Sequence, residues 1–145
     1  MYKKILVPLD GSLRAEAILP YAEGLAACTG ATLILLHIVD APLALVSPYD
    51  VMPSLSMEDL QEQKKQAEAY LQTLQHKLQA KGMQVRAFAE YGAVVTTIIE
   101  VAAREDVGLI AMASHGRTGL SRVFYGSVAD GVLHQVDRPL LLVRA

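Results

Sequence analysis

The stretch Ile5-Leu-Val-Pro-Leu-Asp-Gly-Ser12 joins a short apolar run to a polar turn. Consecutive apolar residues closed by a proline predict a strand that is buried on both faces, as the strands of parallel sheets are. The Asp-Gly-Ser turn places Ser12 where its hydroxyl can cap the first turn of a helix. The stretch therefore predicts a strand, a turn and a helix in that order, which is the repeating unit of α/β proteins.

The same alternation continues to the end of the chain. Apolar runs predict strands at residues 5–7, 32–39, 84–90, 107–113 and 140–143. Helical spacing predicts helices at residues 13–29, from 57 to about 81, at about 93–105 and at 128–136. Strands that alternate with helices pair in parallel through right-handed crossovers. We expect an α/β fold in which residues 1–145 form a single domain, a doubly wound parallel sheet of five strands in the order 3-2-1-4-5 with helices on both faces.

Three details qualify this scheme. Pro20 lies inside the pattern of the first helix, where a proline can kink the helix. The long helix after Ser56 carries one apolar stripe, formed by Leu60, Ala67, Leu71, Leu74 and Leu78. The proline-rich connection 40–56 has no clear periodicity, and its length indicates a functional or mobile loop.

Composition excludes several classes of protein. Hydrophobic residues make up 52% of the chain and charged residues 19%, which excludes intrinsic disorder. The net charge of −2 argues against nucleic-acid partners and against binding to anionic membranes. Prolines interrupt the longest weakly charged stretch, residues 41–57, so we expect no membrane helix. A single cysteine, Cys28, and an N-terminal apolar run too short for a signal peptide predict a cytoplasmic location.

The predicted topology brings two segments to one crevice. In doubly wound sheets, ligands bind outside the carboxyl ends of the strands, at the point where the strand order reverses. Here that point lies between the first and fourth strands, which lead into residues 8–12 and 113–116. We therefore expect these two segments to form a ligand site.

The glycine-rich segment 113–127 favours an anionic ligand. Gly116 and Gly126 allow the main chain to approach a ligand closely. The main-chain amides of Gly126, Ser127 and Val128 lie at a predicted helix N-terminus, where they have no helical acceptor and favour negative charge. The segment therefore predicts a phosphate site.

Charged side chains are expected on both sides of this crevice. Arg117 and Arg122 lie in the glycine-rich segment, which contains no acidic residue. Across the crevice, the Asp10 carboxylate can accept both hydroxyls of a ribose or hold a divalent cation beside phosphates. The main chain of residues 38–40, which ends the second strand, can pair with an adenine edge. Neither a Walker sequence nor G-x-G-x-x-G is present, so the signatures of a P-loop ATPase and of a dinucleotide-binding Rossmann fold are missing.

The spacing of Gly116, Gly126 and Ser127 fits the pattern G-x2-G-x9-G-[ST]. With this pattern, with Pro8-Leu9-Asp10 and with residues 36–40, the chain resembles the nucleotide-binding branch of the universal stress protein family over nearly its whole length. The resemblance implies a five-stranded α/β domain, with ATP or another adenine nucleotide in the crevice and magnesium held through its phosphates. It also implies a homodimer, formed through the last strand, residues 140–143.

The resemblance assigns roles to single residues. It implies that Asp10 contacts the ribose, and that the main chain of Val39 contacts the adenine. It implies that Gly116, Gly126 and Ser127 contact the phosphates, and Asp10 is also a candidate for contact with magnesium. The full set of candidate ATP-binding residues is Pro8, Asp10, Val39, Ala113, His115, Gly116, Arg117, Gly126, Ser127 and Val128.

Position 113 departs from the family pattern, because this chain has alanine where the pattern has its first glycine. If the main chain there requires a positive φ, alanine costs about 1–2 kcal/mol. If the site requires only a small residue near the ribose, the additional methyl group is tolerated.

Simpler roles stay open for several residues. Asp10 can serve only the turn before the first helix, and the Gly126–Ser127 pair can be an empty helix cap. Ser12 is expected to cap a helix rather than to contact a ligand. His37, within the second strand, is expected to be a core residue with one hydrogen-bonded ring nitrogen rather than a ligand contact.

Three functions follow for this sequence. The first is an ATP-binding regulatory protein of the stress response, with at most slow ATP hydrolysis or autophosphorylation because no catalytic pair is evident. The second is a dimeric scaffold that binds no nucleotide, which Ala113 favours. The third is a phosphohydrolase on the same fold, which requires a nucleophile or base that the sequence does not identify.

Overall fold

The protein is seen in a computed structural model that describes residues 2–40, 57–114 and 126–145. Its five parallel strands form one sheet in the order β3-β2-β1-β4-β5, which confirms the predicted fold class. The strands are β1 (Lys4–Leu9), β2 (Thr32–Asp40), β3 (Val85–Gly92), β4 (Leu109–Ser114) and β5 (Leu140–Arg144). The helices are the short 3₁₀ helix η1 (Ala15–Ile18), α1 (Leu19–Thr29), α2 (Met57–Gln79), α3 (Val94–Arg104) and α4 (Ser127–Gln135).

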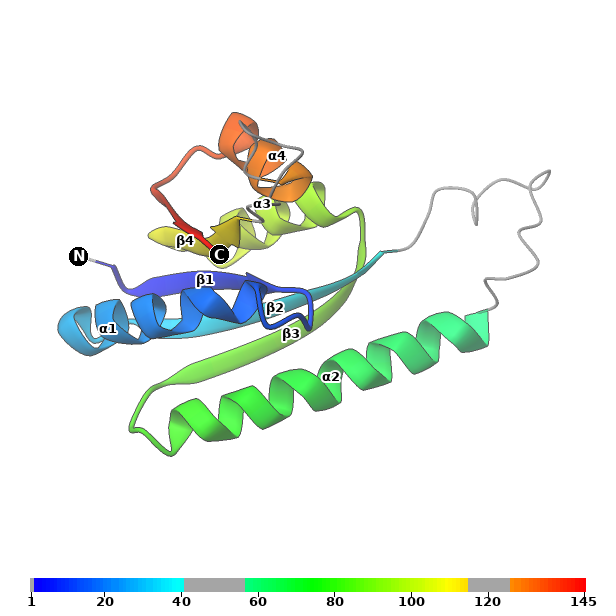
Figure 1. Ribbon diagram of the computed structural model, residues 1–145, viewed down its shortest axis with the longest axis horizontal. Helices are drawn as coiled ribbons and strands as arrows, with labels where there is room; N and C mark the ends of the chain where they lie inside the picture. The colour runs from blue at the N-terminus through cyan, green and yellow to red at the C-terminus, as the bar shows by residue number, and fades with distance from the viewer. Residues whose placement is uncertain (1, 41–56, 115–125) are drawn as a thin grey trace.

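The helices form a layer on each side of the sheet, with α1 and α2 on one side and α3 and α4 on the other (Figure 1). Alternate residues of each strand therefore enter two different cores. Leu33 and Leu35 of β2 pack in the core under α1 and α2, whereas Ile34 and Leu36 pack under α3 and α4. This two-sided burial is why the central strands are apolar at consecutive positions.

The sheet divides at its centre, where the strand order reverses. Strands β1 and β4 pair only at Ile5–Leu109 and Leu6–Ile110, although both strands continue beyond these residues. Strand β1 stays paired with β2 as far as Leu9 and His37. Pro8, which has no N–H group, therefore lies beyond the last pair with β4. The crevice predicted from the topology begins at this point.

The helix predicted over residues 13–29 is divided in two. The 3₁₀ helix η1 comes first, and α1 starts only at Leu19, so Pro20 occupies its first turn rather than its interior. Proline is well tolerated there because the N–H groups of the first turn have no helical acceptor. Pro20 therefore lies at the junction of η1 and α1 rather than inside one long helix, and Gly30 ends α1 as predicted, with a φ of 73°.

The long helix α2 packs on the sheet through the predicted stripe. Its buried residues are Leu60, Ala67, Leu71, Leu74 and Leu78. The other predicted details of this region, those of the connection 41–56, lie outside the described residues. In the part of the chain that the structure describes, no helix is long and apolar enough to cross a membrane.

Two helical glycines, Gly24 and Gly131, differ in their surroundings. Replacing them with alanine should therefore change the free energy of unfolding in opposite directions. A Cβ on Gly131 of α4 would lie 2.7 Å from Cγ2 of Val95 on α3, whereas a Cβ on Gly24 of α1 would have no neighbour within 4 Å. We expect Gly24→Ala to raise the free energy of unfolding by about 0.5–1 kcal/mol, because alanine restricts the unfolded chain. Gly131→Ala should lower it by about 1–3 kcal/mol through overpacking.

Urea denaturation of both variants beside the unaltered protein measures these two effects. An equal gain in stability for both variants would show that α3 and α4 do not approach each other closely at Gly131.

Candidate functional site

A cavity of about 90 Å³ lies at the central crevice. It joins the ends of β1, β2 and β4 to the first turns of α3 and α4, so it brings together the two segments that the topology predicted. Its lining residues are Pro8, Leu9, Asp10, Ala15, Leu36, Ile38, Val94, Ile98, Met112, Ala113, Val128 and Ala129. We call it the crevice cavity.

The crevice cavity is an apolar slot with one charged side chain. Every lining residue except Asp10 is apolar. Apolar walls with a few directional polar groups are typical of sites for small organic ligands. The walls suit the faces of a flat ring, and the exposed Asp10 carboxylate at the rim suits hydroxyl or amine donors.

Asp10 also organises the turn that follows β1. Its Oδ1 accepts a hydrogen bond from the main-chain N–H of Ser12 at 2.9 Å and another from the Ser12 hydroxyl. The Ser12 hydroxyl oxygen in turn accepts the N–H of Ala15, the first residue of η1, at 3.1 Å. Ser12 therefore acts at the start of the helix, as predicted. The turn also fixes the orientation of the Asp10 side chain.

Ala113 sits in an unstrained part of the chain. It lies near the end of β4, where it pairs with Val143 of β5, and it is 9% exposed. Among the described residues other than glycine, Asp106 alone has a positive φ. The main chain at position 113 therefore does not require glycine, and the penalty of about 1–2 kcal/mol for an alanine in a left-handed conformation does not arise.

The N-terminus of α4 has no side-chain cap from the described residues. Gly126 is the N-cap, with φ 84° and ψ 152°. Asp130 donates its N–H to the carbonyl of Gly126, so the N–H groups before it are left without a helical acceptor. Ser127 is exposed and makes no side-chain hydrogen bond to the rest of the described chain. Val128, the next residue, lines the crevice cavity.

Three candidates, His115, Gly116 and Arg117, lie outside the described residues, and so does Arg122. Val39 is placed, but its side chain does not line the crevice cavity, because it is buried against Leu60 and Ala67 on the α2 side. Its main chain lies two residues past the last pair between β1 and β2, which is Leu9–His37. Val39 instead lines a second cavity, beside α2.

Sequence motifs did not identify several walls of the crevice cavity, namely Leu36, Ile38, Val94, Ile98 and Met112. The only available signal was the side-chain alternation of the second strand. Leu36 and Ile38 are two residues apart, so they share the face that points toward α3 and α4.

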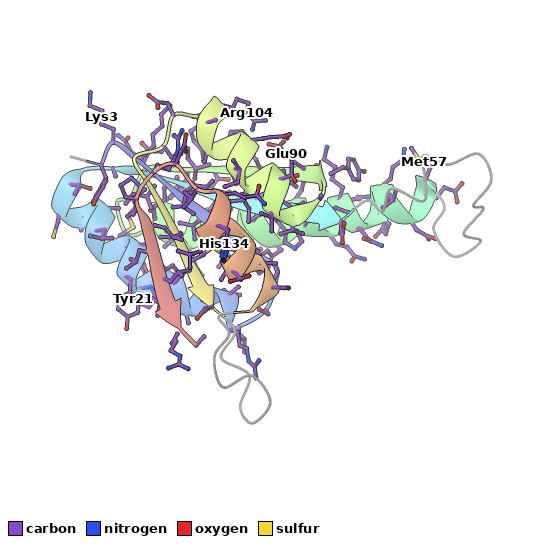
Figure 2. All side chains as sticks on the ribbon, turned by 90° about the horizontal axis from the view of Figure 1, so that it is seen from above. Lys3, Tyr21, Met57, Glu90, Arg104 and His134 are labelled. Carbon is purple, nitrogen blue, oxygen red and sulfur yellow. The ribbon has the colours of Figure 1, made fainter. Side chains whose placement is uncertain are left out.

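The electrostatic surroundings differ between the crevice and the outer surface. No lysine or arginine is among the described residues that line the crevice cavity. On the outer surface, by contrast, Arg104 of α3 forms an ion pair of 2.6 Å with Glu90 of β3 (Figure 2). Arg86 pairs in the same region with Glu105 at 2.8 Å. These pairs keep two described arginines beside carboxylates.

Among the residues that the structure describes, no group of three or more His, Cys, Asp or Glu side chains is placed to hold a metal ion. Magnesium usually keeps water ligands and takes one or two carboxylates together with phosphate oxygens. Asp10 is a carboxylate of this kind at the crevice, so magnesium there would depend on the phosphates of a ligand.

His37 lies behind the crevice, on the α2 side of β2. Its ring meets the ring of Tyr70 edge to face, with 6.0 Å between centroids, and its Nδ1 is buried without a hydrogen-bond partner among the described residues. The hydrogen bond expected for one ring nitrogen of His37 therefore does not come from Nδ1. Burial lowers the pKa of His37, and the negative charge and main chain of Asp10 offset only part of that effect.

The lowered pKa of His37 predicts a pH-dependent stability. The unfolded chain takes up a proton on this residue near pH 6.5, whereas the folded chain does so only at lower pH. The contribution of a neutral His37 is therefore complete above pH 6.5 and falls as the pH drops toward the folded pKa.

The difference in unfolding free energy between the unaltered protein and His37→Phe should consequently shrink below pH 6.5. Urea denaturation from pH 8 to pH 5 measures it, with the exposed His76→Phe as control. A difference that does not change with pH for His37→Phe would contradict the prediction.

Comparison with known proteins agrees with this architecture. The family model described as the universal stress protein family matches residues 1–144. Universal stress protein MJ0577 of Methanocaldococcus jannaschii is 29% identical over 157 aligned residues, which cover 99% of this chain and 96% of that protein. A solved structure of MJ0577 superposes with a TM-score of 0.82, over 100% of this chain and 97% of that one.

Two solved structures with lower identity share the fold. A universal stress protein in complex with cAMP is 21% identical, with a TM-score of 0.70, over 99% of this chain and 97% of that one. A universal stress protein of Archaeoglobus fulgidus in complex with dAMP is 19% identical, with a TM-score of 0.66, over 97% of each chain. Because the family model spans almost the entire sequence, this chain belongs to the universal stress protein family.

Proposed function

We propose that the protein binds ATP or another adenine nucleotide in the crevice cavity and acts as a regulatory module of the stress response in the cytoplasm. One observation carries the proposal. The apolar crevice cavity has the Asp10 carboxylate on one side and the first turn of α4, through Val128 and Ala129, on the other. An adenine nucleotide matches these features in the same order: a flat base for the apolar walls, ribose hydroxyls for the carboxylate, and phosphates for the helix N-terminus.

In this proposal each part of the nucleotide has a partner. The base lies between the apolar walls and pairs at its edge with the main chain of Val39. The ribose hydroxyls donate to Asp10, beside the small residue Ala113. The phosphates accept hydrogen bonds from the first N–H groups of α4 and from the Ser127 hydroxyl. His115, Gly116 and Arg117, which belong to the same glycine-rich segment, are proposed as further phosphate contacts.

Relatives support the choice of an adenine nucleotide. The two complexes with cAMP and dAMP are structures of universal stress proteins that share this fold. Both ligands carry adenine and at least one phosphate. A triphosphate would add negative charge where the helix dipole of α4 favours it.

We propose a binding role rather than rapid catalysis. No nucleophile with an adjacent base stands out around the crevice cavity, and Asp10 is already engaged by the turn. Magnesium, held through the phosphates and Asp10, would supply charge neutralisation at the phosphate tail. The activity expected is at most slow hydrolysis or autophosphorylation.

Ser127→Ala tests the phosphate end of this site. Removing a hydroxyl that bonds an anionic oxygen should weaken ATP binding by about 1–3 kcal/mol. Isothermal titration calorimetry with ATP and magnesium measures the change. Thr73→Ala, which removes an exposed hydroxyl from α2, serves as the control and should leave the affinity unchanged.

Two outcomes would redirect the function. If the unaltered protein ignores ATP at millimolar concentration and is a dimer, the scaffold without nucleotide is the better account. If the unaltered protein releases phosphate rapidly over many turnovers, a phosphohydrolase is the better account. The unstrained main chain at Ala113 removes the feature of the sequence that favoured the scaffold.

We propose further that the protein is a homodimer formed through β5. This strand is an edge of the sheet, and its residues Leu140 to Val143 are apolar yet only half-buried. Exposed apolar edges promote association, and antiparallel pairing of two β5 strands across a two-fold axis would cover them. The mass in solution by light scattering distinguishes this dimer from a monomer.

A further inference from the structure

A second cavity lies between β2 and α2, and we call it the β2–α2 cavity. Its volume is about 300 Å³. A water molecule needs only about 10–15 Å³ of such volume, so this cavity has room for an organic ligand. The crevice cavity is walled by residues of α3 and α4, whereas the β2–α2 cavity is walled by residues of α2. The two cavities share Ile38 of β2 and otherwise extend toward different helical layers.

The β2–α2 cavity has both apolar and polar walls, and it carries negative charge. Gln63 and Gln66 contribute amide groups from α2, and Asp40 contributes a carboxylate from the end of β2. Tyr70 forms another part of the wall, and its hydroxyl donates to Glu16 Oε2 at 2.8 Å. No lysine or arginine is among the described residues that line this cavity. Anionic ligands are therefore disfavoured and cationic ones favoured.

His37 and Gly11 shape another part of this wall. Edge-to-face packing with Tyr70 fixes the His37 ring, whose Nδ1 is buried without a hydrogen-bond partner among the described residues. Gly11, which also lines the cavity, has a φ of +86°. A Cβ on Gly11 would stand 3.7 Å from Nε2 of His37, and glycine leaves that space open.

We propose that the β2–α2 cavity binds a small organic amine in its cationic form. An ammonium group is a donor of three hydrogen bonds and accepts none. The Asp40 carboxylate balances its charge, and the amide oxygens of Gln63 and Gln66 accept its N–H groups. The site borders the proposed nucleotide site, because Ile38 lines both cavities and Val39, proposed to pair with the base, lines this one. The proposal does not depend on nucleotide binding, since the Asp40 carboxylate and the α2 amides lie outside the nucleotide contacts proposed above.

Three four-carbon compounds of matched length test the charge preference. The full chain, without nucleotide, is titrated at constant ionic strength with 1,4-diaminobutane, 1,4-butanediol or succinate. The side-chain resonances of histidine are followed by NMR, and the signals of His37 are assigned by their loss in His37→Gln. We expect a saturable shift of the His37 ring signals with the diamine alone.

Charge variants then locate the site. Asp40→Asn should weaken diamine binding at least about tenfold, which corresponds to the loss of one ion pair of about 1.4 kcal/mol. Glu100→Gln removes an exposed carboxylate from α3, on the other face of the sheet, and should leave the affinity unchanged. Equal responses to the three compounds, no saturable shift, or unchanged affinity in Asp40→Asn would each overturn the proposal.

Discussion

Gly126→Ala is expected to weaken ATP binding at least about a hundredfold, or about 2.7 kcal/mol, while the protein stays folded. The combination of φ 84° and ψ 152° at Gly126 is open essentially only to glycine. An alanine must therefore change the main chain at the N-cap of α4, which turns the first N–H groups of the helix away from the crevice cavity. Isothermal titration calorimetry with ATP and magnesium measures the loss.

Gly30→Ala is the matched control for this prediction. Gly30 also has a positive φ, of 73°, but it ends α1, and a Cβ there would have no neighbour within 4 Å. The substitution should lower the free energy of unfolding by about 1 kcal/mol and leave ATP affinity unchanged. If Gly126→Ala binds ATP as tightly as Gly30→Ala does, the N-terminus of α4 is not the phosphate site.

Asp10→Asn is expected to weaken ATP binding by about tenfold to a hundredfold, because hydrogen bonds to a charged acceptor contribute about 1.5–3 kcal/mol. Asparagine keeps one acceptor oxygen for the N–H and hydroxyl of Ser12, so the turn after β1 should survive. It loses the charge that favours the two ribose hydroxyls and magnesium. The expected result is a loss of affinity with little change in the unfolding free energy.

Ser12→Ala separates the turn from the ligand. This change removes the oxygen that accepts the N–H of Ala15 but keeps the Asp10 carboxylate. It should lower the unfolding free energy by about 1 kcal/mol, as the loss of a helix cap does, and leave ATP affinity nearly unchanged. Should Asp10→Asn bind ATP like the unaltered protein, Asp10 serves only the turn.

The strand order was predictable because local pattern and burial agree in this chain. Ile5, Leu6 and Val7 are consecutive apolar residues, and each is fully buried under one of the two helical layers. The stripe of α2 could be predicted for the same reason, since one face of that helix meets the sheet. Local pattern failed at Pro20, where the apolar spacing of the region continued across a change from a 3₁₀ helix to an α-helix.

The crevice was predictable in its location and only partly in its walls. Glycines and an aspartate at turns stand out in the sequence. Asp10, which lines the crevice cavity, and Gly126, the N-cap of α4, could therefore be selected as candidate site residues. Leu36 and Met112 could not, because an apolar strand residue has the same sequence pattern whether it faces a packed core or a cavity.

Position 113 and His37 show a second limit. Whether alanine is strained depends on φ, and whether a ring nitrogen finds a partner depends on distances to residues far away in the sequence. Neither the φ of Ala113 nor the partners of the His37 ring can be predicted from the neighbouring sequence alone. The structure gives the main chain at Ala113 an ordinary conformation, and it leaves Nδ1 of His37 buried without a partner among the described residues.

The central claim is that an adenine nucleotide occupies the crevice cavity with its phosphates at the N-terminus of α4. A crystal structure of the protein grown with saturating ATP and magnesium tests it most directly. The account predicts the base between Ile38 and the other apolar walls, the ribose at Asp10 and the phosphates at Gly126 and Ser127. A crevice cavity without nucleotide under these conditions, or ATP bound elsewhere on the protein, would contradict it.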